Sequence, residues 1–193
     1  MHIINCVNMK KFLTLLLSAV LWLAAICLFA FSGSIHPAFY AYVGTFIPFA
    51  FAFIYLYAAS KMKSFGVATI LNGFLLFVFI VSGEADLWMG IMLVVIIALS
   101  EFLRYKYGYD TKKGTRVSFL PLAFTFFAYT SHWWTDTAGS LQAALVEMPE
   151  GYAAKMEPVI ENVPVYMLMI VMVVPMAILA MRLAEKVLKK HIR

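Results

Sequence analysis

Charged residues are scarce in this chain, and their scarcity excludes a water-soluble domain. Lysine, arginine, aspartate and glutamate together make 13% of the 193 residues, whereas hydrophobic residues make 64%. Soluble domains carry about 25% charged residues, so this balance indicates a membrane protein. The net charge of +5 does not indicate nucleic-acid binding. The cations stand at the ends of apolar runs, where membrane topology explains them.

Cysteine and the common catalytic motifs are nearly absent as well. Cys6 precedes the first apolar run and Cys27 lies within it, so the two predict neither a disulfide nor a metal framework. The sequence has no zinc-binding His-Glu-x-x-His, no phosphate-binding loop and no Gly-x-Ser-x-Gly elbow. We therefore expect no catalytic residue, metal or cofactor, and no ATP hydrolysis by this chain alone.

What the sequence does contain is a series of apolar runs. Each is about 17 to 25 residues long, which is enough to cross a hydrocarbon core about 30 Å thick. The runs are 12–31, 38–60, 65–81, 87–103, 117–134 and 164–183. No linker rich in Ser or Gly and no internal repeat divides them. The predicted fold is an all-α membrane protein with one domain over residues 1–193, a single bundle of six transmembrane helices.

The charges between the runs are separated by sign. With the N-terminus inside, the inner side holds 14 of the 15 cations and three acids, a net of +11. The outer side holds Lys155 and seven acids, a net of −6. Cationic loops stay cytoplasmic during insertion, so both termini are predicted to be cytoplasmic, in a multi-pass protein of a bacterial-type cell membrane. The first run follows Lys10 and Lys11 and is long for a signal peptide, which predicts an uncleaved anchor.

The outer loop 135–163 is the longest connection. Leu141, Ala144, Leu145 and Met148 recur at helical spacing, which predicts a short amphipathic helix that ends at Pro149. One interpretation is a helix that lies on the membrane surface and only packs there. The other is a lid over a binding cavity.

Aromatic and polar residues gather at the outer ends of the runs. Tryptophan at a membrane boundary is typical of an interfacial belt, but a belt does not require His132 and Asp136 four residues apart. Three outer connections can converge on an aromatic, polar cavity that suits a flat organic ligand. The candidate substrate-binding residues are His132, Trp133, Trp134, Asp136, Tyr129, Glu84, Asp86, Trp88, His36 and Tyr40.

Ionisable residues are sparse within the runs. Glu101 and Arg104 stand about one helical turn apart, which predicts an ion pair between them rather than catalysis. The runs lack the chain of Asp, Glu or His that an ion-coupled pump tends to carry. Pro48 and Pro175 lie inside runs and predict kinks.

Two basic segments follow the apolar runs: Lys61-Met62-Lys63-Ser64-Phe65-Gly66 and Ala184-Glu185-Lys186-Val187-Leu188-Lys189-Lys190-His191-Ile192. In these segments, in its length and in its six predicted crossings, the chain resembles the Trep_Strep family of integral membrane proteins. That family is grouped with the substrate-binding S components of energy-coupling factor (ECF) transporters. The resemblance implies a subunit of an ECF-type ABC importer that captures a small organic micronutrient at an outward-facing pocket. It also implies a coupling transmembrane protein and two cytoplasmic ATPases as partners. The implied ligand is vitamin-like, with a haem-like molecule or a metal chelate as further options.

The resemblance also implies a docking surface for the coupling protein. S components often present small residues four positions apart, a spacing found at Thr14 and Ser18 and at Ala180 and Ala184. Ordinary packing within the bundle explains the same spacing. Two other classes of function stay open: a self-sufficient carrier or channel, and a membrane enzyme that acts on lipid or peptide.

Overall fold

The computed structural model describes residues 2–190, and the side chains of residues 9–190. Within this range the chain forms helices and turns, and no strand. The α-helices are α1 (His2–Phe31), α2 (Pro37–Tyr42), α3 (Pro48–Lys61), α4 (Val67–Ser82), α5 (Leu87–Tyr107), α6 (Lys112–Leu122), α7 (Thr125–Thr130), α8 (His132–Thr135), α9 (Thr137–Glu147), α10 (Tyr152–Glu161) and α11 (Val163–Leu188). Two short 3₁₀-helices, η1 (Ser32–Ser34) and η2 (Val43–Thr45), flank α2. The side chain of Cys6 lies outside the described range.

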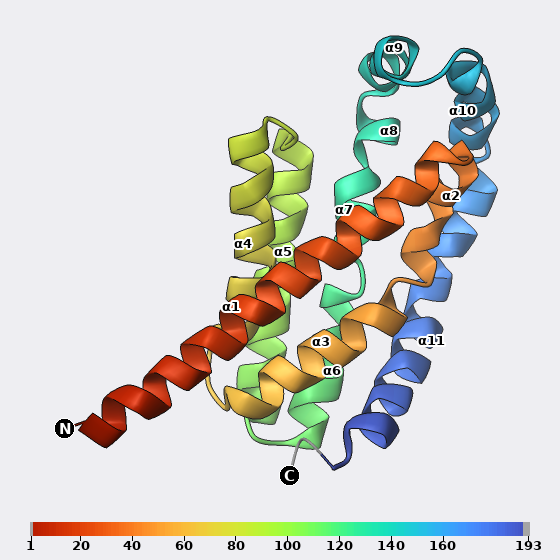
Figure 1. Cartoon of the computed structure of the whole chain (residues 1–193). Coiled ribbons are helices and arrows are strands. Elements are labelled where there is room, and N and C mark those ends of the chain that lie inside the picture. Colours follow the sequence, from red (N-terminus) through yellow and green to blue (C-terminus); the bar gives the residue numbers. More distant parts are fainter. Residues whose placement is uncertain (1, 191–193) are drawn as a thin grey trace.

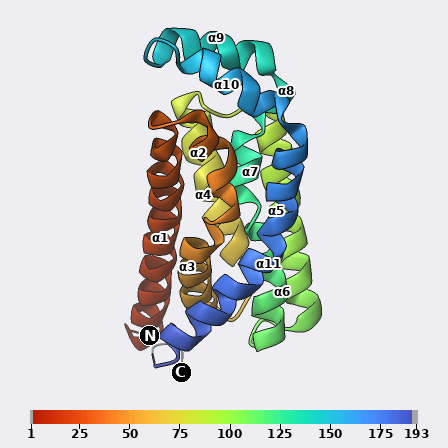
Figure 2. The same ribbon diagram turned by 90° about the vertical axis from the view of Figure 1, so that its right-hand side faces the viewer.

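The longer helices form an elongated bundle with two different ends. Helices α9 and α10 lie across one end, and the first turn of α1 and the last turn of α11 lie at the opposite end (Figures 1 and 2). The turn from α5 to α6 is also at that opposite end (Figure 2). We call the end beneath α9 and α10 the outer end and the other the inner end, after the predicted orientation.

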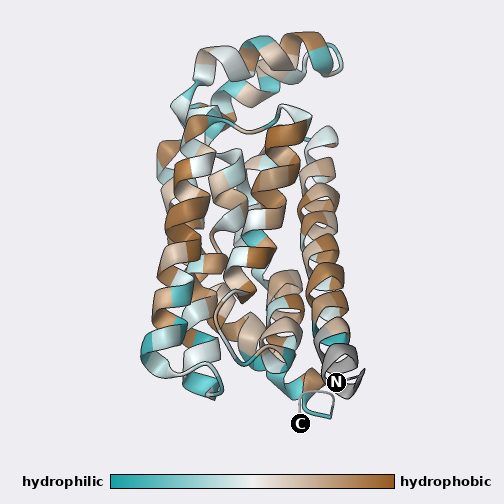
Figure 3. Cartoon of the chain, turned by 90° about the vertical axis from the view of Figure 1, so that its left-hand side faces the viewer, coloured by the Kyte–Doolittle hydropathy of each residue, from teal (hydrophilic) through white to brown (hydrophobic). Residues whose placement is uncertain are grey.

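Three of these helices are long and apolar enough to cross a membrane. The spans are Met9–Ser34, Leu87–Tyr107 and Val163–Leu188, and α2 with η2 and α3 makes a fourth if this bent pair is one span. Apolar side chains such as Phe12, Val94 and Val171 are more than half exposed on them. Figure 3 shows that hydrophobic residues follow one another along α1. Such surfaces suit lipid contact, because soluble monomers rarely expose large apolar patches.

Two of the six predicted crossings are not continuous helices. The second run is broken between α2 and α3, which meet at an angle of 45°. Pro48 is the first residue of α3 rather than a residue inside a helix, because it has no N–H to donate to the preceding turn. The fifth run is divided into α6, α7 and α8, and Pro121 stands in the last turn of α6. The six-crossing count stays a prediction.

A buried polar contact joins three of the runs in the middle of the bundle. Trp22 on α1 stacks on Phe51 of α3 at 3.7 Å between ring centroids. Its indole Nε1 donates a hydrogen bond of 2.9 Å to Oδ1 of Asn72 on α4. The Asn72 amide Nδ2 donates in turn to Oγ1 of Thr125 at the start of α7, at 3.0 Å. These bonds satisfy polar groups that water cannot reach, and so tie the helices together.

Glu101 and Arg104 do not form the predicted ion pair. Both are buried, at 4% and 1% exposure, but each contacts the end of a different helix. Glu101 Oε1 accepts hydrogen bonds from the N–H groups of Gly66 (3.0 Å) and Thr69 (3.2 Å), at the start of α4. A carboxylate is favoured there because helix N-termini carry free N–H groups and partial positive charge.

Arg104 makes the complementary contacts at the end of α3. Its Nη2 donates to the carbonyl oxygens of Ala59 (2.9 Å), Met62 (2.7 Å) and Tyr109 (3.2 Å). The first two carbonyls lie at the C-terminus of α3, where partial negative charge favours a cation. The two side chains of α5 therefore hold both ends of the α3–α4 turn, which is the Lys61 to Gly66 segment.

Candidate functional site: a cavity at the outer end

A cavity of about 870 Å³ lies at the outer end of the bundle, beneath α9 and α10. Its walls come from the end of α1, from α2, from the turn between α4 and α5, and from α7 and α8. We call α9 and α10 the roof. The volume is within the range of small-molecule sites, about 300 to 1,000 Å³.

Eight of the ten predicted substrate-binding residues line this cavity. They are Tyr40, Glu84, Asp86, Trp88, Tyr129, His132, Trp133 and Asp136. They come from three connections that are far apart in sequence, and the fold brings these connections together. Their convergence is what the sequence pattern predicts, whereas ligand binding by these residues stays a prediction.

Tyr40 is at the centre of the aromatic wall. Its ring stacks on Trp133 with centroids 4.6 Å apart and contacts Tyr129 edge to face at 5.8 Å. Tyr129 stacks in turn on Phe79 of α4 at 4.9 Å. This close packing holds the rings in fixed orientations, so a planar ligand would meet a preformed aromatic surface.

His132 presents one ring nitrogen for further bonding. Its Nδ1 lies 3.0 Å from the carbonyl oxygen of Tyr129. A carbonyl oxygen only accepts, so Nδ1 carries the proton in this bond. In the neutral ring Nε2 is then an acceptor, suited to an N–H or O–H group.

Two of the carboxylates that line the cavity also cap the N-termini of helices. Asp86 Oδ1 accepts from the N–H of Met89 at 2.8 Å and caps α5. Asp136 Oδ1 accepts from the N–H of Gly139 at 3.1 Å and caps α9. The helical face predicted to hold His132 and Asp136 is therefore interrupted. Helix α8 ends at Thr135, and Asp136 has a non-helical backbone.

The carboxylates of Glu84 and Glu147 line the cavity without capping a helix. Both are exposed, and neither has a hydrogen bond or ion pair with another described residue. Among the described lining residues there are four carboxylates and no lysine or arginine. The cavity therefore has an acidic rim above an aromatic wall.

His36 and Trp134, the other two predicted residues, lie outside the cavity lining. The ring Nδ1 of exposed His36 accepts from the N–H of Ala38 at 3.2 Å and caps α2. Trp134 stacks on Tyr166 of α11 at 3.6 Å and donates from Nε1 to the carbonyl oxygen of Ile160 at 3.1 Å. His36 therefore serves as a helix cap. Trp134 packs on α11 while Trp133 faces the cavity, because consecutive residues of a helix face different neighbours.

The roof contains two helices, α9 and α10, and the sequence pattern predicts only the first. Ala144 and Leu141 pack inward from α9, but Leu145 is 68% exposed. Helix α10 packs on Ala41 and Trp133 in a small hydrophobic cluster. The buried residues that α10 adds to this cluster are Tyr152, Met156, Val159 and Ile160. Their spacing is helical, so the missed signal was present in the sequence.

Tyr152 fastens the roof to the end of α1. Its hydroxyl donates a hydrogen bond of 2.9 Å to the carbonyl oxygen of Gly33. Burial raises the pKa of this hydroxyl above 10, so it remains protonated at neutral pH. A Cβ at Gly33 would come within 2.8 Å of Cβ of Tyr40, so only glycine allows this approach. Gly33 and Tyr152 line the cavity and were not predicted as site residues.

The four predicted docking residues do not form an exposed surface. Ser18, Ala180 and Ala184 are buried, at 2%, 0% and 0% exposure. The hydroxyls of Thr14 and Ser18 donate to carbonyl oxygens of their own helix, at Lys10 and Thr14. The small residues of α11 belong to the bundle core, where they permit close helix packing. In this structure their spacing serves packing within the chain.

No metal centre is evident among the described residues. No group of three or more His, Cys, Asp or Glu side chains there is placed to hold a metal ion. Cys27 lines the cavity as an exposed free thiol.

The apolar helices and their lipid-facing surfaces define an integral membrane protein. A comparison with protein families matches residues 9–193 to the family described as hypothetical bacterial integral membrane protein (Trep_Strep). The chain belongs to this family. Neither the curated proteins nor the solved structures gave a match.

Proposed function

We propose that this protein is the substrate-binding S component of an ECF-type importer in the bacterial cytoplasmic membrane. In this proposal the outer cavity captures a small organic molecule, and a coupling transmembrane protein and two cytoplasmic ATPases supply the energy. The observation that carries the proposal is the aromatic cavity of about 870 Å³ at one end of a membrane bundle. The absence of a phosphate-binding loop from the sequence agrees with an energy source outside this chain.

The orientation of the cavity follows from the charge distribution. The cavity has carboxylates on its rim, whereas the inner end carries the cations of α6 and of the C-terminal part of α11. In the positive-inside orientation the cavity opens to the outside and both termini are cytoplasmic. The roof then lies on the side from which a nutrient arrives, as a lid would.

The ligand class that fits the cavity best is a flat organic cation. Trp88 lines the cavity with 55% of its surface exposed, beside the stacked rings of Tyr40 and Trp133, and aromatic rings attract cations as well as other rings. Glu84 and Glu147 are available for a positive charge. A haem-like ligand fits less well, because its own carboxylates would meet an acidic rim that contains no lysine or arginine among the described residues.

The first experiment is mass spectrometry of molecules that remain bound after gentle detergent extraction from native membranes. A retained organic cation, together with a coupling protein and ATPases in the same preparation, is the expected result. Recovery without any ATPase contradicts the S-component assignment. Uptake by liposomes that contain this chain alone would favour the self-sufficient carrier instead.

A second experiment measures binding directly through tryptophan fluorescence. N-methylquinolinium is a flat cation and naphthalene-2-sulfonate is a flat anion. Because the rim of the cavity is acidic, we expect the cation to quench the tryptophan fluorescence at a much lower concentration than the anion. Trp88→Phe/Trp133→Phe removes both tryptophans of the cavity lining and should abolish this response, whereas Trp134→Phe, whose ring lies outside the cavity, should keep it.

Two matched double variants test whether the cavity needs its carboxylates to bind a cation. Glu84→Gln/Glu147→Gln removes two carboxylates from the rim, and Glu157→Gln/Glu161→Gln removes two exposed carboxylates of α10 outside the cavity lining. We expect the first pair to weaken cation binding about tenfold or more and the second to leave it unchanged. Equal effects of the two pairs contradict a charge-selective site.

A further inference from the structure

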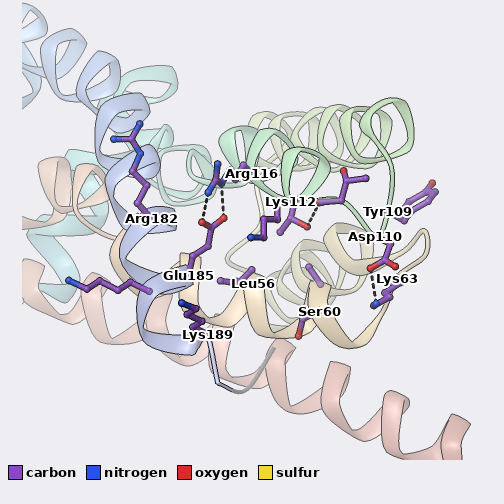
Figure 4. Close-up of a pocket in the computed structure, with 14 residues that line it drawn as sticks. Leu56, Ser60, Lys63, Tyr109, Asp110, Lys112, Arg116, Arg182, Glu185 and Lys189 are labelled. Carbon is purple, nitrogen blue, oxygen red and sulfur yellow. Dashed lines mark hydrogen bonds and ion pairs between the residues drawn. The ribbon is translucent and has the colours of Figure 1, made fainter. Parts of the chain in front are cut away.

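A second groove lies at the inner end of the bundle, far from the outer cavity. It encloses about 760 Å³ between α3, the turn from α5 to α6, α6 itself and α11 (Figure 4). Leu56 and Ala59 of α3 form its apolar floor, with Ser60 beside them. The described lining residues include six cations and two carboxylates.

Both carboxylates of the groove are already neutralised. Asp110 forms an ion pair with Lys63 at 2.7 Å between Oδ1 and Nζ. Glu185 accepts two hydrogen bonds from the guanidinium of Arg116, with Nε at 2.7 Å from Oε1. Figure 4 shows these two pairs as dashed contacts at opposite sides of the groove.

The remaining cations leave an excess positive charge. Lys112, Arg182, Lys186 and Lys189 line the groove and have no ion pair among the described residues. The Arg182 guanidinium points away from the Arg116–Glu185 pair, whereas Lys112 extends into the space beside that pair (Figure 4). Lys112 is also the first residue of α6, whose N-terminus, capped by the Thr111 hydroxyl, adds partial positive charge beside this side chain.

The groove continues onto an apolar surface that suits hydrocarbon chains. Leu179, Leu183 and Val187 of α11 are exposed by 44% to 57%, close to the lining residues of the same helix. A molecule with an anionic head and apolar tails would match this combination. A soluble anion would use the cations but not the neighbouring apolar surface.

We propose that this inner groove binds the phosphate group of an anionic phospholipid, with the lipid tails against α11. Positive-inside topology alone places cations at this end, but it does not require a groove lined by apolar residues of α3 in which both carboxylates are neutralised. The site is separate from the outer cavity, and its occupancy does not depend on the proposed transport function.

The test compares two variants that remove the same charge from the full-length protein. Lys112→Ala/Lys189→Ala removes two cations from the groove, and Lys10→Ala/Lys11→Ala removes two exposed cations of α1 outside it. Each is reconstituted in nanodiscs that contain equal amounts of phosphatidylglycerol and phosphatidylcholine. Native mass spectrometry then counts the lipids retained after the protein leaves the disc.

We expect the wild type and the α1 variant to retain phosphatidylglycerol selectively. The groove variant should lose this selectivity by about thirtyfold, because each cation near anionic lipid contributes about a fivefold factor. Lys112→Arg/Lys189→Arg should restore retention if charge is what matters. Circular dichroism and gel filtration establish that the variants are folded.

A separate arm distinguishes lipid from free phosphate. Inorganic pyrophosphate is titrated into the detergent-solubilised protein by calorimetry. Tight pyrophosphate binding without selective lipid retention would overturn the lipid as the source of the phosphate. Equal lipid retention by the two charge-matched variants would overturn the site itself.

Discussion

The hydroxyl of Tyr152 on α10 donates a hydrogen bond of 2.9 Å to the carbonyl oxygen of Gly33 at the end of α1. This bond joins the roof of the outer cavity to one of its walls across 119 positions of sequence. The rest of the roof is held by a small cluster separate from the bundle core and by hydrogen bonds from Tyr42 and Trp134 to the end of α10. The Tyr152 bond therefore restrains the start of α10.

Tyr152→Phe should loosen the roof without unfolding the bundle. Loss of one neutral hydrogen bond is worth about 1 kcal/mol, so we expect hydrogen exchange across residues 137–161 to rise about fivefold. Tyr105→Phe, at an exposed position of α5, is the control and should change nothing in this segment. Unchanged exchange in Tyr152→Phe would mean that the bond does not restrain the roof.

The same bond predicts a pH dependence. The pKa of Tyr152 is raised by burial from 10.0, so its contribution to stability is complete below about pH 10. The contribution is lost as the pH rises through the raised pKa, where the folded state must release the proton. The difference in Tm between wild type and Tyr152→Phe should therefore be constant from pH 6 to about pH 9.5 and shrink at higher pH. A difference that already shrinks below pH 9 contradicts this assignment.

Asn72→Leu should destabilise the bundle by breaking the contact between three runs. It leaves Trp22 Nε1 without its acceptor and Thr125 without its donor. Buried polar groups without partners cost about 1 to 3 kcal/mol, and interhelical bonds in membranes average about 0.6 kcal/mol. We expect a lower Tm in detergent, and a double-mutant cycle with Trp22→Phe should be non-additive. Strict additivity would show that the two residues do not interact.

Glu101 is expected to act in folding rather than in catalysis. Glu101→Ala removes the acceptor for Gly66 and Thr69 at the start of α4 and should cost about 2 kcal/mol. Glu101→Gln keeps one carbonyl oxygen as an acceptor and should lower the free energy of unfolding less than Glu101→Ala does. Glu161→Ala, at an exposed position, is the control for loss of a carboxylate. A variant that keeps wild-type Tm but loses an enzymatic activity would instead favour the membrane-enzyme class.

The predicted orientation can be tested by cysteine labelling in intact cells. In a background without Cys6 and Cys27, Thr135→Cys beneath the roof should react with an impermeant maleimide. Lys112→Cys at the inner groove should react only after the membrane is opened. The physical reason is that α6, α7 and α8 separate the two positions along the bundle. Labelling of both from the same side would overturn the orientation.

The convergence of the outer connections was predictable because it follows from topology. Once the runs are placed as crossings, Tyr40, Glu84 and His132 must lie at one end of the bundle, and the structure places them around one cavity. Which neighbours face inward was not predictable. Trp133 lines the cavity and Trp134 packs on Tyr166, because the direction of α8 depends on its contacts with α10 and α11.

Glu101 and Arg104 illustrate the same limit inside the bundle. Their spacing of three residues permits an ion pair on an isolated helix, and the sequence contains nothing that argues against one. In the folded chain, each side chain meets the end of a neighbouring helix that offers several backbone groups of the right charge. The α3–α4 turn they hold contains one of the two basic segments that carry the family resemblance.

The sequence by itself determined the class of protein, its helical character and the separation of charge between its two ends. These properties are sums over local residues, because hydropathy, helix length and loop charge depend on no distant contact. Only the tertiary structure decided where the runs break, which residues line the outer cavity, and that α10 completes its roof. Those features depend on contacts between segments far apart in the chain, such as Tyr152 with Gly33, whose geometry arises only when the helices pack.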